Sequence, residues 1–120
     1  MAGARGEGYL DVDGEQVVVL FTNRALADGE RATGKSILQI LRGAQNQELG
    51  IGDVAQLLLV GMEAARREAR SASRAYAIAD AYRVMDAVGF TEVASVVFNA
   101  IAAVVAYDGT GGMRPNPPVE

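Results

Sequence analysis

The hydrophobic pattern of the chain begins with two short β-prone runs, YLDV and EQVVVLF, which flank Asp13 and Gly14. A two-residue Asp-Gly loop between such runs is a strong hairpin signal, because both central residues of a type I′ turn need a positive φ. We therefore expect a β-hairpin over residues 9–22. A lone hairpin is marginally stable in water, so it is expected to pack against helices.

Helical spacing of apolar residues follows the hairpin. Thr22 or Asn23 is a suitable N-cap for the segment NRALADGERAT, and Gly34 stands where a glycine would end that helix. Ser36 is placed to cap the next helix, ILQILRGA, which Gly43 is expected to close.

Three further helices are expected in the second half of the chain. Asp53 is predicted to cap a long helix whose apolar residues recur at i, i+3, i+4 and i+7. Those residues are Val54, Leu57, Leu58, Gly61, Met62 and Ala65. Ser71 or Ser73 is predicted to begin the fourth helix, which ends at Gly89. Thr91 is predicted to cap the last helix, EVASVVFNAIAAVVAY.

These elements predict one small, mainly α-helical domain, of about four to five helices with an N-terminal β-hairpin. The domain is expected to span residues 9–108, with the hairpin over 9–22 and helices over 23–108. The Gly-rich residues 1–8 are expected to form a disordered leader. Residues 109–120 are expected to form a flexible Gly and Pro tail.

The composition excludes several function classes. The net charge is -4 and Lys35 is the only lysine, which argues against a nucleic-acid surface. Without Cys or His, the chain has no thiolate, no imidazole base and no common zinc ligand. The longest apolar stretch, Val93–Tyr107, is shorter than the ~20 residues that cross a bilayer. We expect an intracellular protein without catalytic residues, cofactor or metal.

The segment GERATGKS, from Gly29 to Ser36, matches the phosphate-binding pattern G-x-x-x-x-G-K-[ST]. Such a loop needs a buried strand directly before it, whereas NRALAD before Gly29 is a helix-forming sequence. We therefore interpret Gly34 as the end of one helix and Ser36 as the cap of the next. A regulator that binds a nucleotide or phosphate with the Gly29–Ser36 loop and Lys35 is kept as the alternative function.

Other polar and aromatic groups are interpreted as structural. Asp11 and Asp13 in DVDG resemble metal-binding carboxylates, but Asp before Gly is what the turn requires. A run of arginines could meet an acidic partner, although interleaved glutamates favour a solvated helix face. The run comprises Arg66, Arg67, Arg70 and Arg74, with Glu63 and Glu68. Tyr76, Tyr82 and Met85 are expected in the core.

The last helix is apolar nearly all round, with Glu92, Ser95 and Asn99 as its polar breaks. A helix of this kind must be buried on several sides, and a chain this small offers little to cover it. Its outer face is therefore predicted to bind a partner or a second copy. The residues assigned to that face are Val97, Ile101, Val104 and Val105. Full burial within the monomer remains the alternative.

The order of elements resembles the tail assembly chaperones of long-tailed phages and of gene transfer agents. The matching segments are LFTNRALADGERATGKSILQILRGA, IGDVAQLLLVGMEAARREA and DAVGFTEVASVVFNAIAAVVA, and the resemblance covers roughly Tyr9 to Tyr107. In the family pattern, Glu30 and Gly34 mark the end of the first helix, and the residue types at positions 29 and 35 are not specified. Gly29 departs from the apolar residue that is more common there.

The resemblance implies a non-enzymatic role in the cytoplasm of a bacterial host. Such chaperones bind the long, hydrophobic tape measure protein, keep it soluble, and help tail tube subunits polymerise around it. The implied partners are thus the tape measure protein and the tail tube protein, with self-association as a further expectation. A small helical structural adaptor that stays in the virion is a further alternative, since it shares this composition.

Overall fold

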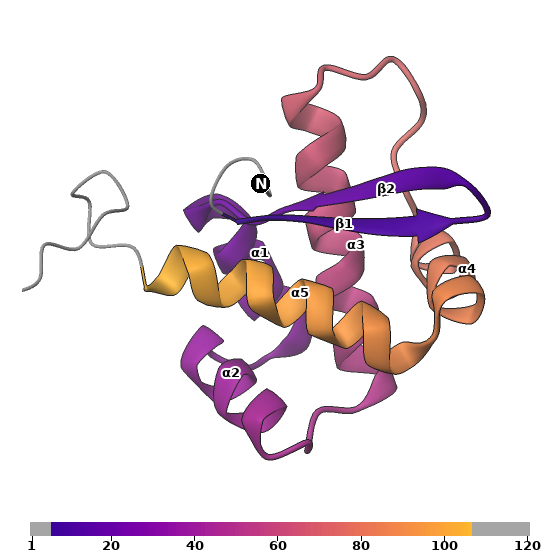
Figure 1. Cartoon of the computed structure of the whole chain (residues 1–120). Helices are drawn as coiled ribbons and strands as arrows, with labels where there is room; N and C mark the ends of the chain where they lie inside the picture. Colours follow the sequence, from indigo (N-terminus) through magenta and orange to yellow (C-terminus); the bar gives the residue numbers. More distant parts are fainter. Residues whose placement is uncertain (1–5, 107–120) are drawn as a thin grey trace, which may run out of the picture.

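The computed structural model describes residues 6–106 of the chain. Two strands come first, β1 (Glu7–Val12) and β2 (Glu15–Leu20). Helices follow in the order α1 (Asn23–Thr33), α2 (Ile37–Gln45), α3 (Ile51–Glu68), α4 (Ile78–Val88) and α5 (Phe90–Val105). The prediction of a mainly α-helical fold with an N-terminal hairpin is therefore confirmed (Figure 1).

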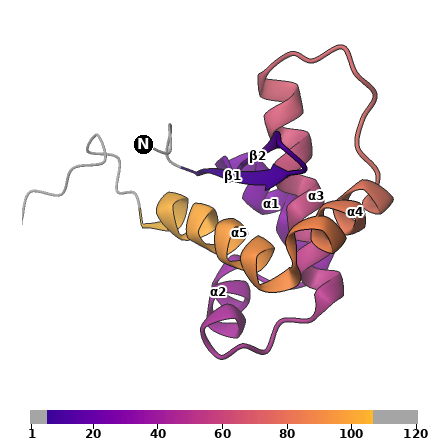
Figure 2. The ribbon, with the colours of Figure 1, turned by 45° about the vertical axis from the view of Figure 1, so that its right-hand side comes forward.

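The long helix α3 is the centre of the fold, because β2, α1, α4 and α5 all pack against it. The hairpin crosses α3, and α5 runs beside β1 (Figure 1). In two views α2 lies on the side of α5 that faces away from the hairpin (Figures 1 and 2). One edge of α5 thus contacts the hairpin, and another faces α2.

Apolar side chains from the hairpin and from the helices form one core. Its largest fully buried members are Phe21, Ile40, Leu57, Leu58, Ile101, Val19, Val54, Val93 and Val97. Met85 is buried, as the sequence predicts. The expectation that Tyr76 and Tyr82 lie in the core is wrong, since both side chains are exposed. A tyrosine can cover apolar neighbours with its ring and keep its hydroxyl in water, so helical spacing alone does not place it inside.

The hairpin has the predicted turn. Val12 pairs with Glu15, and the two residues between them both have positive φ, 53° at Asp13 and 85° at Gly14. The carboxylate of Asp11 accepts a hydrogen bond of 3.0 Å from the Gly14 N–H. Asp11 is therefore a turn residue, as expected. Among residues 6–106 no group of three or more carboxylates is placed to hold a metal ion.

Replacing Gly14 with Val is expected to destabilise the protein by about 1–2 kcal/mol through backbone strain alone. A Cβ atom at this position would meet no atom within 4 Å, so the strain comes from the backbone and not from overlap at the Cβ. Chemical denaturation followed by circular dichroism measures the change. Gly14→Asn is the control, because asparagine tolerates positive φ and should lose less. Equal stability of Gly14→Val and the parent would contradict the turn.

The first helices have the predicted caps. The Thr22 hydroxyl accepts a 3.1 Å hydrogen bond from the Ala25 N–H, and Gly34 ends α1 with φ of 74°. Ser36 caps α2 in a reciprocal arrangement with Gln39. The prediction that Gly43 closes α2 is wrong, because the helix continues to Gln45.

The later helices begin at other residues than predicted. α3 begins at Ile51, so Asp53 lies within its first turn. α4 begins at Ile78, several residues after Ser71 and Ser73. α5 begins at Phe90, so Thr91 is inside the helix. The cap positions of these helices are Gly50, Ala77 and Gly89, which have no side chain able to accept a hydrogen bond.

The predicted leader over residues 1–8 is partly ordered, since β1 begins at Glu7. The carbonyl of Gly6 accepts a 2.8 Å hydrogen bond from the Phe21 N–H. A Cβ atom on Gly8 would lie 2.7 Å from a methyl carbon of Val96 in α5, closer than carbon atoms pack. These glycines therefore allow β1 to approach α5. The predicted tail, 109–120, lies outside the described residues.

Candidate functional site

Most of the Gly29–Ser36 segment is helical, since α1 continues to Thr33 and only residues 34–36 connect it to α2. Gly29 is buried within α1, where a Cβ atom would lie 3.0 Å from a methyl carbon of Leu57. Glycine at this position therefore allows close packing of α1 against α3. Gly34 donates its N–H to the Glu30 carbonyl at 2.8 Å, which ends the helix. The interpretation of this segment as a helix end followed by a helix start is confirmed.

The donors that would hold a phosphate here already have partners. The Ser36 N–H donates to the Gln39 side chain at 2.8 Å, and the Ile37 N–H donates to the Glu30 carboxylate at 2.8 Å. The Lys35 ammonium lies 3.0 Å from a carboxylate oxygen of Asp53. A carboxylate thus occupies the helix N-terminus that an anion would need. The geometry does not favour the nucleotide-binding alternative.

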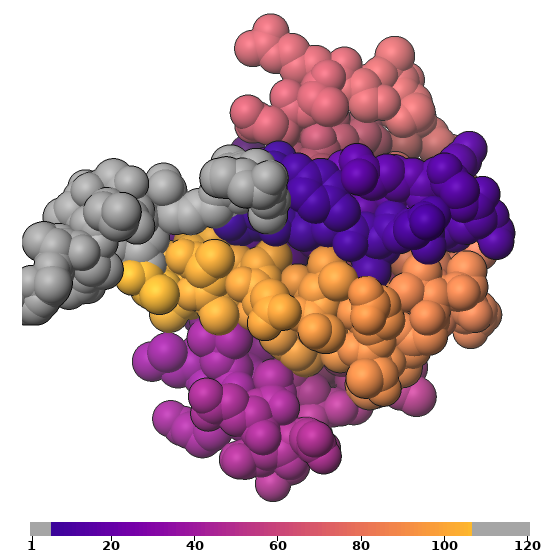
Figure 3. Space-filling model, viewed as in Figure 1, coloured from indigo at the N-terminus to yellow at the C-terminus, as the bar shows by residue number. Residues whose placement is uncertain are grey.

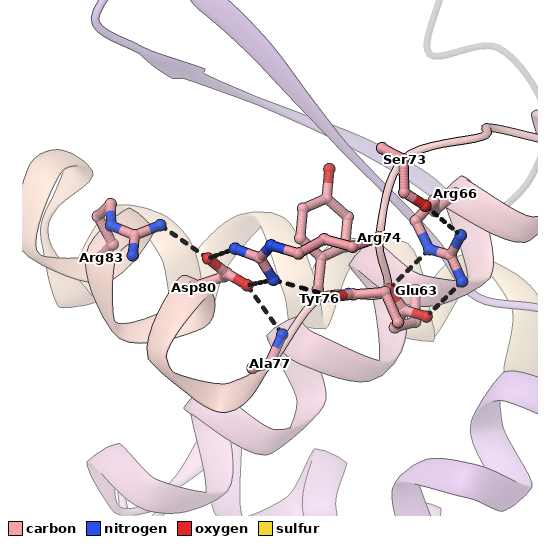
Figure 4. A network of polar contacts seen from close by, with 9 residues as sticks. Glu63, Arg66, Ser73, Arg74, Tyr76, Ala77, Asp80 and Arg83 are labelled. Carbon is pink, nitrogen blue, oxygen red and sulfur yellow. Dashed lines mark hydrogen bonds and ion pairs between the residues drawn. The ribbon is translucent and has the colours of Figure 1, made fainter.

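Several of the arginines hold the connection between α3 and α4 (Figure 4). Arg66 makes two hydrogen bonds to the Glu63 carboxylate, at 2.9 and 3.0 Å, and a third at 3.1 Å to the Ser73 carbonyl. Glu63 also accepts a bond from the Tyr76 N–H at 2.5 Å. The hydrogen bond from the Arg66 guanidinium has the largest effect and lowers the pKa of Glu63. Desolvation raises this pKa, but the bond from the Tyr76 N–H lowers it as well, so the net shift is downward. The predicted solvated face is wrong for Arg66 and Glu63, which clamp this loop.

Asp80 is the second anchor of the same connection. Its side chain is 7% exposed and accepts bonds from Arg74 at 3.1 and 3.2 Å, from the Ala77 N–H at 2.8 Å and from Arg83 at 2.7 Å. These hydrogen bonds hold the pKa of the Asp80 carboxyl well below its usual range. The bond from Arg74 has the largest effect, followed by those from the Ala77 N–H and Arg83. These contacts fix the start of α4, so the cluster has a structural explanation without a ligand.

Replacing Asp80 with Asn is expected to lower the melting temperature at neutral pH, because Asn offers no charge to the two arginines. The native pKa lies below the unfolded value of about 3.9, so the carboxylate stabilises the fold above that pH. Its contribution is lost as the pH falls toward the native pKa. The difference in melting temperature between parent and Asp80→Asn should therefore shrink below about pH 4. A constant difference between neutral and acid pH would contradict this role.

An open groove of about 700 Å³ lies between α2 and α5. On the face in Figure 3, α2 (purple) lies below α5 (orange and yellow). α2 contributes Leu41 and Ala44 to its lining, α3 contributes Val54, and the connection between α2 and α3 contributes Leu49. The remaining lining residues are Gln45, Gln47, Phe90, Thr91, Ala94, Ser95, Phe98, Asn99 and Ala102.

α5 contributes two parallel rows of side chains to this groove. Phe90, Ala94, Phe98 and Ala102 recur every four residues and form an apolar row. Thr91, Ser95 and Asn99 form a neutral polar row beside it. Phe90 is 38% exposed, which is unusual for a large aromatic residue with no polar group. The groove can therefore bury apolar surface of a partner and offer hydrogen bonds along its edge.

The predicted partner-binding residues are divided between faces. Val97 and Ile101 are fully buried, so their assignment to the outer face is wrong. Val104 is half-buried and faces the hairpin, where a Cβ atom on Gly6 would lie 2.6 Å from its methyl carbon. Val105 is exposed. The outer face of α5 is the one that includes Ser95 and Asn99. Those polar breaks were a usable signal, because exposed faces of apolar helices collect the polar residues.

Comparison of the chain with protein-family models, with curated proteins and with solved structures finds no match. Within residues 6–106, no single helix has both the length and the apolar composition to cross a bilayer, although α4 and α5 pass that test as a pair bent by 115°. The groove between α2 and α5 is therefore assigned as the candidate site from its own geometry.

Proposed function

We propose that the protein is a non-enzymatic tail assembly chaperone of a long-tailed phage or gene transfer agent. In this role it binds the tape measure protein and assists polymerisation of the tail tube protein in the cytoplasm of the bacterial host. The sequence resemblance over roughly Tyr9 to Tyr107 supports the proposal. The single structural observation in its favour is the open apolar groove between α2 and α5.

The groove has the properties that such a chaperone needs. It leaves Phe90 and part of Phe98 accessible on a folded domain, so apolar segments of a partner can bury surface there without unfolding the chaperone. Each buried apolar Å² contributes about 25 cal/mol to association before the cost of ordering is subtracted. The net charge of -4 on this chain favours solubility of such a complex.

Co-expression with a phage or gene transfer agent tape measure protein tests the proposal. The soluble fraction of the tape measure protein is measured with and without the chaperone, by centrifugation and immunoblotting. We expect the parent chain to keep it soluble. An unchanged soluble fraction would overturn the proposal, and presence of the chain in purified mature particles would point to the structural adaptor instead.

Two matched aromatic substitutions connect the effect to the groove. Phe90→Asp places a charge in the groove, whereas Tyr82→Asp places one on an aromatic position of α4 outside it. The two residues are similarly exposed, 38% and 41%. Phe90→Asp is expected to lose solubilisation while Tyr82→Asp keeps it, and circular dichroism confirms that both fold. Equal loss in both variants would place the binding surface elsewhere.

A further inference from the structure

The apolar row of α5 alternates between large and small side chains. Phe90 and Phe98 are large, whereas Ala94 and Ala102 are small. The row therefore has two low positions, the alanines, which are eight residues apart. At 1.5 Å per residue these positions are separated by about 12 Å along the helix. Large side chains of a second helix fit such positions when rows with four-residue spacing interdigitate. The shape of the wall therefore suits a helix with large apolar residues two turns apart.

The polar residues that line the groove are all uncharged. They are Gln45, Gln47, Thr91, Ser95 and Asn99, and no Asp, Glu, Lys or Arg is among the lining residues. A charged side chain brought into the groove would lose its hydration without gaining a counter-ion, which costs several kcal/mol. An uncharged apolar and small-polar surface meets no such penalty. The lining thus selects against a charged docking surface.

We propose that the groove binds one α-helix of the partner through an uncharged row of side chains, with two large apolar residues seated beside Ala94 and Ala102. The identity of that partner, the tape measure protein, rests on the proposed function. The stretch from Phe90 to Ala102 spans about 18 Å, which corresponds to about three turns of the bound helix. Charged residues of the bound helix point to solvent.

A second copy of this chain fits the groove less well. Two copies with a charge of -4 each repel one another. The exposed surfaces of α1 and α4 carry charged residues such as Arg31, Arg83 and Asp86, which an uncharged groove does not accommodate. The partner helix is therefore the occupant to which the proposal commits.

Two designed peptides of about 15 residues test the chemistry of the groove without any phage sequence. The neutral peptide has two Leu residues eight positions apart on a face of Ala, Ser and Gln, with Lys and Glu on the opposite face. The charged peptide has Lys in place of the Ser residues beside the Leu row. Fluorescence anisotropy measures binding to the full chain at about 0.05 M and about 0.5 M salt. We expect only the neutral peptide to bind, with an affinity that changes by less than about twofold with salt.

Matched variants locate the binding. Ala102→Leu fills one low position of the row and is expected to weaken binding at least about tenfold. Ala103→Leu makes the same change at the neighbouring exposed residue, which does not line the groove, and is expected to have no effect. Asn99→Asp adds a charge with almost no change in shape, and it should weaken binding of the neutral peptide. Circular dichroism verifies that all three variants fold.

Three results with the peptides would overturn this inference, and sedimentation could give a fourth. They are absence of binding by the neutral peptide, equal or tighter binding of the charged peptide, and equal affinity of Ala102→Leu and the parent. Sedimentation of the parent chain tests the other occupant: a dimer that Ala102→Leu converts to a monomer would assign the groove to a second copy. Each of these results is independent of tape measure solubility, so the inference and the proposed function can fail separately.

Discussion

Replacing Gly61 with Val is expected to destabilise the protein by about 3 kcal/mol or more. Gly61 lies where α3 crosses β2, and a Cβ atom there would lie 2.9 Å from two ring carbons of Phe21 and 2.9 Å from the Cβ of Val19. Both neighbours are buried in the core, and the Cβ of Val19 is fixed to its backbone. The added atoms can fit only if the hairpin moves away from α3.

Gly52→Val is the matched control, because Gly52 belongs to the same helix and a Cβ atom there would meet no other atom within 4 Å. Val has a slightly higher helix propensity than Gly, so both substitutions gain a few tenths of a kcal/mol locally. The difference between the free energies of unfolding of the two variants then measures the cost of steric overlap where α3 crosses β2. Urea denaturation followed by circular dichroism gives both values. Equal stability of the two variants would contradict the close approach of α3 to the hairpin.

The parts of the fold that could be predicted are those that local chemistry decides. Asp13 and Gly14 specify the turn by their tolerance of positive φ, and Gly34 ends α1 for the same reason. Ser36 begins α2 because its hydroxyl reaches an N–H three residues along. Each of these signals acts within about four residues, so the sequence contains all the information it needs.

The parts that could not be predicted depend on contacts between distant residues. Residues 71–77 look like the start of a helix, but Glu63 holds the Tyr76 N–H across thirteen positions of the chain. The approach of β1 to α5 likewise needs Gly8, which in the sequence belongs to a segment that resembles disorder. Neither contact follows from periodicity, because the residues meet only once α3 and α5 are in place.

The candidate site was only partly accessible to sequence reasoning. The sequence predicts an outer apolar face on α5, and residues of α5 line the groove, but the assignment of Val97 and Ile101 to the outer face was wrong. The four-residue spacing from Phe90 to Ala102 was present in the sequence. The opposite wall was not, since α2 faces α5 only through the tertiary fold.

Replacing Ile101 with Asp is expected to cost several kcal/mol, enough to unfold a domain of this size. The Ile101 side chain is 0% exposed and packs in the core, so a carboxylate there would be buried without a partner. The group would either stay charged in an apolar environment or bind a proton at a raised pKa, and both choices destabilise the folded state. Loss of the cooperative thermal transition in circular dichroism is the expected result.

Val105→Asp is the comparison, because Val105 lies one helical turn further along α5 and is 40% exposed. The new carboxylate stays in water, so the change in stability is expected to be within about 1 kcal/mol, including its unfavourable position at the helix C-terminus. Because both variants add the same charge to the same helix, net charge cannot explain a difference between them. If Ile101→Asp melted like Val105→Asp, the buried face of α5 would be assigned wrongly, and with it the orientation of the row that lines the groove.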